Sequence, residues 1–147
     1  MFKSLKPVKK LNPISRILSD GTGFNRFLGY HGNIEKQTIN NNDYRHVKFT
    51  GKHEQLVLMS LLPGQEIGNE VHKHADQFFR IEHGTLKFIL NNGKDTFTLG
   101  AGGSVVVPLG TWHNVVNVGR DKAKLYTVYA QPTHPAGLIQ KTRPRND

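Results

Sequence analysis

The chain has 147 residues, enough for one domain with a buried core, and it contains no cysteine. The absence of cysteine excludes disulfide bonds, thiolate metal sites and cysteine nucleophiles. Lysine and arginine number 20 against 11 aspartate and glutamate residues, giving a formal net charge of +9, and no apolar run is long enough to span a membrane as a helix.

The excess positive charge is concentrated at the start of the chain. Residues 1–32 contain six lysine or arginine residues and one acid, Asp20. We therefore predict a basic N-terminal extension over residues 1–32, which either is a solvated arm or contacts nucleic acid or another polyanion. The acid-poor composition also leaves an organellar presequence open, although Pro7 and Pro13 would interrupt a long amphipathic helix. No secretory signal is recognisable, so we expect a cytoplasmic or other intracellular location.

From about Glu35 onward the sequence reads as short strands, and no segment there predicts a helix. The expected strands are rich in Val, Ile, Phe, Tyr and Thr and cover residues 44–50, 55–62, 77–82, 85–90, 95–99, 104–107, 112–117 and 124–130. Asn92-Gly93 predicts a hairpin between the fourth and fifth of them. So many short strands predict an all-β sandwich or barrel over residues 33–131, followed by a C-terminal strap or tail at 132–147.

Two spaced patterns in the middle of the chain contain the candidate chemistry. The first consists of Gly64, Glu70, His72, Gln77 and Gly84, with five, one, four and six residues between successive members. The second consists of Gly102, Pro108, Gly110, His113 and Asn117, with five, one, two and three residues between them. Side chains two apart on a strand face the same side, so Glu70 and His72 can both point into a barrel.

The family resemblance described below implies that Glu70, His72, Gln77 and His113 hold one divalent transition metal. Two imidazoles, a carboxylate and an amide oxygen suit Mn, Fe, Ni, Co or Zn and are poor ligands for Cu(I). With four protein ligands, an octahedral ion keeps two positions open for water or a small-molecule ligand.

Other residues near these patterns have more than one interpretation. His72 and His74 form an alternative His-x-His pair, but choosing it would break the spacing to Gly64 and Gln77. In the preferred register His74 is an accessory residue near the barrel mouth or simply exposed. By alternation we expect four side chains to face inward, where they either line a ligand pocket or fill the barrel: Phe79, Ile81, Val115 and Asn117.

The spacing of both patterns resembles the two signature motifs of the cupin superfamily, with Glu70 where the family usually has His and Gln77 where it usually has Glu. From about residue 33 to 142 the chain is similar to small single-domain bacterial cupins of the mannose-6-phosphate isomerase-like (cupin 2) group, notably in Asp76–Glu82 and Gly110–Val115. The resemblance implies a double-stranded β-helix, or jelly-roll barrel, a metal site and a homodimer.

Three functions follow from these observations. The first is a metal-dependent enzyme on a small molecule, isomerising a sugar or sugar phosphate through metal polarisation of a carbonyl. The second is an Fe(II)-type dioxygenase. The third is a non-catalytic binding or structural cupin whose basic arm contacts a polyanion or a partner. We favour a metal-dependent enzyme, although the sequence does not identify its catalytic residues.

Overall fold

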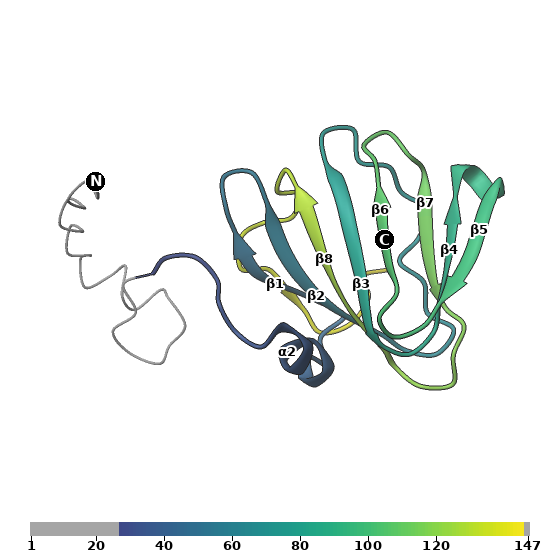
Figure 1. Cartoon of the computed structure of the whole chain (residues 1–147), viewed down its shortest axis with the longest axis horizontal. Coiled ribbons are helices and arrows are strands. Elements are labelled where there is room, and N and C mark those ends of the chain that lie inside the picture. Colours follow the sequence, from purple (N-terminus) through teal and green to yellow (C-terminus); the bar gives the residue numbers. More distant parts are fainter. Residues whose placement is uncertain (1–26, 146–147) are drawn as a thin grey trace, which may run out of the picture. The chain divides into compact units, whose positions relative to one another are not determined.

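The computed structural model describes residues 27–145, within which the chain from Gly32 onward folds as one unit. The strands of this part of the chain are β1 Arg45–Thr50, β2 Gln55–Leu61, β3 Asp76–His83, β4 Leu86–Leu90, β5 Asp95–Leu99, β6 Ser104–Val107, β7 His113–Asn117, β8 Ala123–Ala130 and β9 Ile139–Gln140 (Figure 1). The predicted basic extension at residues 1–32 lies almost entirely outside the described residues.

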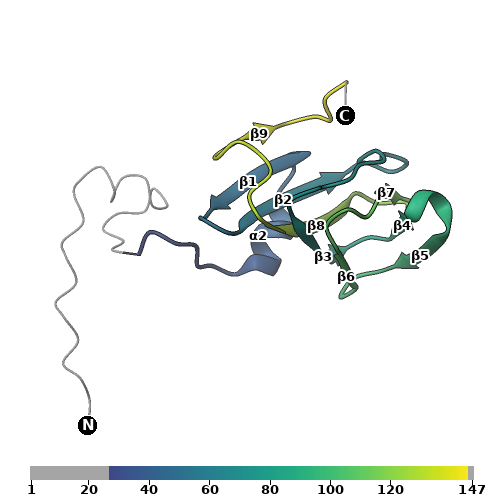
Figure 2. The same cartoon turned by 90° about the horizontal axis from the view of Figure 1, so that it is seen from above.

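The strands form two antiparallel sheets. The larger sheet has the order β6-β3-β8-β2-β1-β9, and the smaller has the order β5-β4-β7. Figure 2 shows β9 running beside β1, on the far side of the molecule from β4 and β5. The predicted all-β jelly-roll fold is therefore confirmed, and all eight predicted strands are present with bounds shifted by no more than a residue or so. The ninth strand, β9, lies in the segment predicted as a strap and pairs with β1.

The hydrophobic core lies between the two sheets. Along β3 buried and half-buried residues alternate, and Phe79 and Ile81 are fully buried on the inner face. The Phe79 ring packs edge-on against the ring of Phe88 from β4, with 5.5 Å between the centroids. Each such side chain contributes about 1.5–3 kcal/mol by leaving water. The inward positions predicted for Val115 and Asn117 on β7 are likewise buried.

The predicted Asn92-Gly93 hairpin is present: β4 and β5 are antiparallel, and the pair nearest the turn is Leu90 with Asp95. Its loop is the short 3-10 turn η1, Asn91–Gly93, in which Asn91 and Asn92 have φ angles of 53° and 57°. Asparagine tolerates this left-handed region better than other side chains, which explains its double use here.

The expectation that no helix follows residue 35 was wrong. Helix α2 spans Ile34–Asn40, and the side chain of Asn33 caps it by accepting a hydrogen bond from the backbone nitrogen of Lys36 at 2.9 Å. Of its residues only Thr38 is buried, so the helix has no apolar stripe from which a period of 3.6 could be read. Contacts with β8 and β3 hold it against the larger sheet. Within residues 27–145, neither helix has the length and apolar character needed to cross a bilayer.

Candidate metal centre

Glu70 and His113 are brought together by the backbone. The two residues form an isolated antiparallel bridge in which each backbone nitrogen donates to the other residue's carbonyl at 2.9 Å. Residues paired in this way carry their side chains on the same side of the sheet. His72 lies two residues after Glu70, and its carbonyl accepts a hydrogen bond from the backbone nitrogen of Gly110. Gly110 has a φ of 79°, which a residue with a side chain would adopt only with strain.

These three side chains converge on one point. Oε1 of Glu70 lies 3.3 Å from Nε2 of His72 and 3.4 Å from Nε2 of His113. One ligand atom from each residue lies within 4.8 Å of the other two. Both Nε2 atoms are buried, and neither makes a hydrogen bond of good geometry. Buried polar atoms without partners are costly in a folded protein, and a cation between them would satisfy all three groups. The cluster of Glu70, His72 and His113 could therefore bind a metal ion.

The protonation of the cluster also suits a cation. Nδ1 of His113 lies 2.9 Å from the carbonyl oxygen of Thr111, which can only accept, so Nδ1 carries the hydrogen. In a neutral ring the lone pair is then on Nε2, the atom that faces Glu70. Burial raises the pKa of Glu70, but hydrogen bonds and charge from the His113 and His72 rings in their protonated form, which has hydrogen on both nitrogens, outweigh it and bring the pKa to about 2. The carboxylate is therefore ionised at neutral pH.

Gln77, the fourth predicted ligand, lies on β3 and is 1% exposed. Its Nε2 donates to Oγ1 of Thr127 at 2.9 Å, while its Oε1 is buried without a hydrogen-bond partner. In this arrangement the amide atom left over is the oxygen, the atom that binds cations. The ligand role of Gln77 stays a prediction.

A cavity of about 260 Å³ lies beside the cluster, and His72 is the cluster residue that lines it. Its walls are formed by Val71–Ala75 on one side and by Gln131–Thr133 on the other. His74 is exposed and lines this cavity, outside the cluster of Glu70, His72 and His113. The arrangement therefore favours the Glu70/His72 register over the His72/His74 pair.

The four residues predicted to line a pocket lie deeper in the barrel. The Phe79 ring contacts the His113 ring edge-on, with 6.1 Å between centroids. Ile81 and Val115 belong to the hydrophobic core. The amide of Asn117 donates to the carbonyls of Leu61 and Asp121 and accepts from the backbone nitrogen of Gly119. Their role in binding a ligand stays a prediction.

Sequence reasoning missed the polar residues that surround the cluster on β8 and after it. Tyr129 is buried, its ring meets the His72 ring edge-on at 5.3 Å, and it pairs with Gln77 across β3 and β8. Burial and the nearby Glu70 carboxylate raise the pKa of Tyr129 well above its usual value. The Tyr129 hydroxyl lies 3.2 Å from Nε2 of His134. Alternation along residues 124–130 groups Thr127 with Tyr129, but only the register between strands places them beside Gln77.

The fold and the cluster define the class of this protein: a two-sheet β-barrel that encloses two histidines and one carboxylate able to bind a metal ion. Comparisons with known proteins identify the family. Residues 57–129 match the cupin domain family. An uncharacterized protein of Acanthamoeba polyphaga mimivirus is 43% identical over 119 residues, which cover 80% of this chain and 74% of that protein. The crystal structure of BH2720 from Bacillus halodurans is similar with a TM-score of 0.76 and 38% identity, covering 78% of this chain and 89% of that one. The chain belongs to the cupin family.

The relatives differ in how much of their length is shared. The uncharacterized protein YrkC of Bacillus subtilis is 44% identical over 115 residues, which cover 76% of this chain but 62% of YrkC. This chain thus corresponds to less than two thirds of that relative. What these relatives establish is the fold and the family.

Proposed function

We propose that this cupin is a metal-dependent enzyme acting on a small oxygen-bearing molecule of the sugar or sugar-phosphate type. The observation that carries the proposal is the convergence of two buried imidazole Nε2 atoms, both without hydrogen-bond partners, on the Glu70 carboxylate at 3.3 and 3.4 Å. His72 also lines a cavity of about 260 Å³ beside the cluster, and this cavity is the route by which we expect a small molecule to approach.

The proposed ligands are Glu70, His72, His113 and Gln77. A divalent Mn, Fe, Ni, Co or Zn ion, when bound, would act as a Lewis acid on a substrate oxygen or on water. The ionised Glu70 offsets part of the ion's charge, and the Thr111 carbonyl holds the His113 ring with its Nε2 lone pair inward. The Gln77 amide contacts Thr127 through its nitrogen, which leaves its oxygen for the ion.

Tyr129 is the residue we assign to proton handling. Its raised pKa keeps the hydroxyl protonated at neutral pH, so it can donate a hydrogen bond to a developing negative charge. His134 lies 3.2 Å from that hydroxyl and is half-buried, so it connects Tyr129 to the outside. Isomerisation next to a carbonyl requires a base that takes a proton from one carbon and returns it to the next. The protonated Tyr129 cannot accept that proton, and the imidazole of His134 is the group of this pair that can.

A specific observation supports a second candidate, an Fe(II) dioxygenase. Two histidines and one carboxylate are the donor set of non-haem Fe(II) oxygenases. The apolar ring of Phe79 against His113 also suits a site that excludes water from one side. The two candidates differ in one measurable quantity, the consumption of oxygen.

Metal analysis of the purified protein tests the site itself. We expect a divalent transition metal in near-stoichiometric amount, and Glu70→Gln, His72→Ala and His113→Ala should each weaken metal binding by about a hundredfold or more. His74→Ala is the matched control, because it removes an imidazole from the same loop that lies outside the cluster. A wild-type protein that binds no metal, or an equal loss in His74→Ala, would contradict the assignment.

The reaction is then sorted with metal-loaded protein. Aldose and ketose phosphates are assayed for interconversion without oxygen, and aromatic and diketone substrates are assayed for oxygen uptake. Turnover in the first panel alone supports the isomerase, and turnover in the second alone supports the dioxygenase. If both panels are negative with metal bound, the non-catalytic cupin gains support. Deletion of residues 1–32 would then test whether the basic arm binds a polyanion.

We also propose that the protein is a homodimer. Strands β6 and β5 are edges of their sheets, and an exposed edge is a site for pairing with another chain. Val106 on β6 is 65% exposed, which leaves an apolar side chain at that edge. Light scattering during size-exclusion chromatography should give twice the chain mass, and a Val106→Lys variant should elute as a monomer. A wild-type monomer would contradict this proposal.

A further inference from the structure

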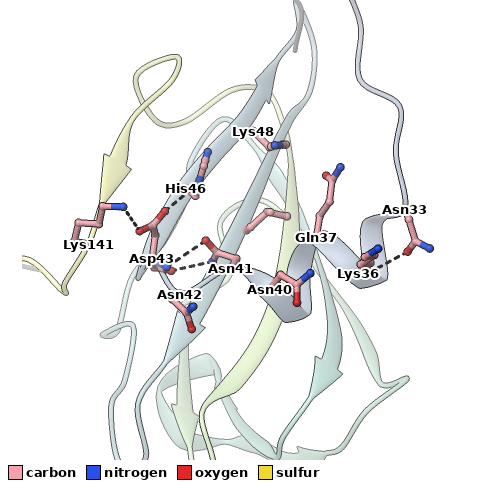
Figure 3. Close-up of a pocket in the computed structure, with 11 residues that line it drawn as sticks. Asn33, Lys36, Gln37, Asn40, Asn41, Asn42, Asp43, His46, Lys48 and Lys141 are labelled. Carbon is pink, nitrogen blue, oxygen red and sulfur yellow. Dashed lines mark hydrogen bonds and ion pairs between the residues drawn. The ribbon is translucent and has the colours of Figure 1, made fainter. Parts of the chain in front are cut away.

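A second cavity, of about 620 Å³, lies on the outer side of the larger sheet (Figure 3). Its walls come from α2, from the loop Asn41–Asp43, from β1 and from Lys141 after β9. The lining residues are Asn33, Lys36, Gln37, Asn40, Asn41, Asn42, Asp43, His46, Lys48, Leu58 and Lys141. His46 and Leu58 are paired across β1 and β2, while the next pair, Val47 and Val57, points into the core. This cavity and the metal centre are therefore on opposite faces of the sheet.

The cavity is rich in positive charge. It contains three lysines, and its single carboxylate, Asp43, is already paired with Lys141 at 2.9 Å and with His46 at 3.1 Å. Lys36 and Lys48 form no ion pair within residues 27–145. Figure 3 shows Lys48 on β1 and Lys36 on α2 at separate places around the cavity. Two uncompensated ammonium groups are thus left to face a ligand.

A further lysine supports the cavity from behind. Nζ of Lys124, a residue of β8, donates to the carbonyl of Asn41 and to Oδ1 of Asn42, the latter at 3.0 Å. Lys124 is buried, and no carboxylate within residues 27–145 pairs with it. The side-chain amide of Asn41 in turn donates to the carbonyl of Asp43 and accepts a hydrogen bond from the backbone nitrogen of Asp43. The loop that forms this wall is therefore fixed in place, and the cation behind it adds to the positive potential of the cavity.

The remaining lining residues indicate the rest of the ligand. Five of them are amides, which donate and accept hydrogen bonds as hydroxyl groups require. Leu58 is the only apolar residue among them, and the one aromatic ring is the imidazole of His46, which is paired with Asp43. A nucleobase is typically held by stacking on large aromatic rings, and this cavity has no Phe, Tyr or Trp to provide them. The lining suits a molecule that combines hydroxyl groups with an anionic group.

We propose that this cavity is a binding site for a small phosphorylated polyol of the sugar-phosphate class, separate from the metal centre. Lys36 and Lys48 supply the positive charge that attracts the phosphate, and amides of α2 and of the loop that follows it, Asn40 and Asn42, bind the hydroxyls. The site does not depend on a bound metal, so it stands or falls independently of the proposed enzyme.

The test uses glucose 6-phosphate, inorganic phosphate and glucose as probes for the full-length protein. Calorimetry gives the affinities, and backbone amide shifts in NMR spectra give the location. The phosphorylated sugar should bind more tightly than either other probe, with shifts centred on residues 36–48. Lys36→Gln/Lys48→Gln should weaken its binding about five- to tenfold. Lys87→Gln/Lys94→Gln is the matched control, because it removes the same charge from exposed positions in and beside β4.

Each other result would overturn the proposal. Shifts centred on residues 70–72 and 113 would mean that the probe binds at the metal centre. An equal loss in the control pair would mean that only net charge matters. Equal affinity for inorganic phosphate and glucose 6-phosphate would remove the role of the amides, and no measurable binding of the sugar phosphate would remove the site.

Discussion

The structure makes a quantitative prediction for Gln55, a fully buried glutamine at the start of β2. Its Nε2 donates to Oγ1 of Thr50 at 2.9 Å and to the carbonyl of His134 at 2.7 Å. Its Oε1 accepts from the backbone nitrogens of Thr133 and His134 at 3.1 and 2.9 Å. One side chain therefore fixes the backbone of the segment that forms one wall of the metal-site cavity and presents His134 to Tyr129.

Gln55→Met keeps the length and nearly the volume of the side chain and removes all four hydrogen bonds. A typical hydrogen bond contributes about 0.5–1.5 kcal/mol net, so the four together contribute about 2–6 kcal/mol. Part of this is recovered if the segment moves outward and its backbone groups bind water, so we expect a loss of about 2–4 kcal/mol. Packing contributes little to the loss, because methionine is close to isosteric with glutamine.

Two measurements check this prediction. Urea unfolding gives the change in the free energy of unfolding, and amide hydrogen exchange reports on Thr133 and His134 directly. Gln131→Ala is the control, because Gln131 is an exposed glutamine of the same segment whose amide lies 3.4 Å from an exposed His53. A loss below about 0.5 kcal/mol in Gln55→Met, with exchange at both amides unchanged, would refute the reasoning, since surface changes alone have effects of that size.

Two further predictions concern pH. The pKa of Tyr129 is raised in the folded protein, so between the ordinary value of 10.0 and that higher value this tyrosine ionises only in the unfolded chain. The free energy of unfolding should therefore fall as pH rises above 10.0. Unfolding curves at a series of pH values should show a smaller fall in Tyr129→Phe. The hydrogen bond from Lys141 lowers the pKa of Asp43, so its stabilisation is present above the ordinary value of 3.8 and is lost as pH falls through the lower folded value. Asp43→Asn should cost about 0.5–1 kcal/mol at pH 7 and nothing in strong acid, and an equal cost at both pH values would contradict this.

The strands and three of the candidate metal ligands could be predicted from the sequence, because short segments encode both. Alternation identified the eight strands, and the resemblance of two spaced patterns to the cupin motifs selected Glu70, His72 and His113. The period of two along a strand explains why Glu70 and His72 share a face. Helix α2 was missed because it is short, polar and held by tertiary contacts rather than by an apolar stripe. The contacts of Tyr129 were missed because they depend on the register between β3 and β8, which neither strand specifies alone.

The residues that escaped sequence reasoning share one physical property, which bears on how the site works. Gln55 contacts a segment 79 positions away, and the hydrogen bond between Gln77 and Thr127 joins residues 50 positions apart. The first contact fixes a wall of the cavity beside the cluster, and the second holds the side chain of Gln77, a proposed ligand, through its amide nitrogen. Hydrogen bonds between residues far apart in the sequence therefore position the groups around the cluster, while two short motifs determine which donor atoms the cluster contains. It follows that a substitution at Gln55 should alter access to the centre without changing the donor set. Metal content should then stay near that of the wild-type protein even where stability falls.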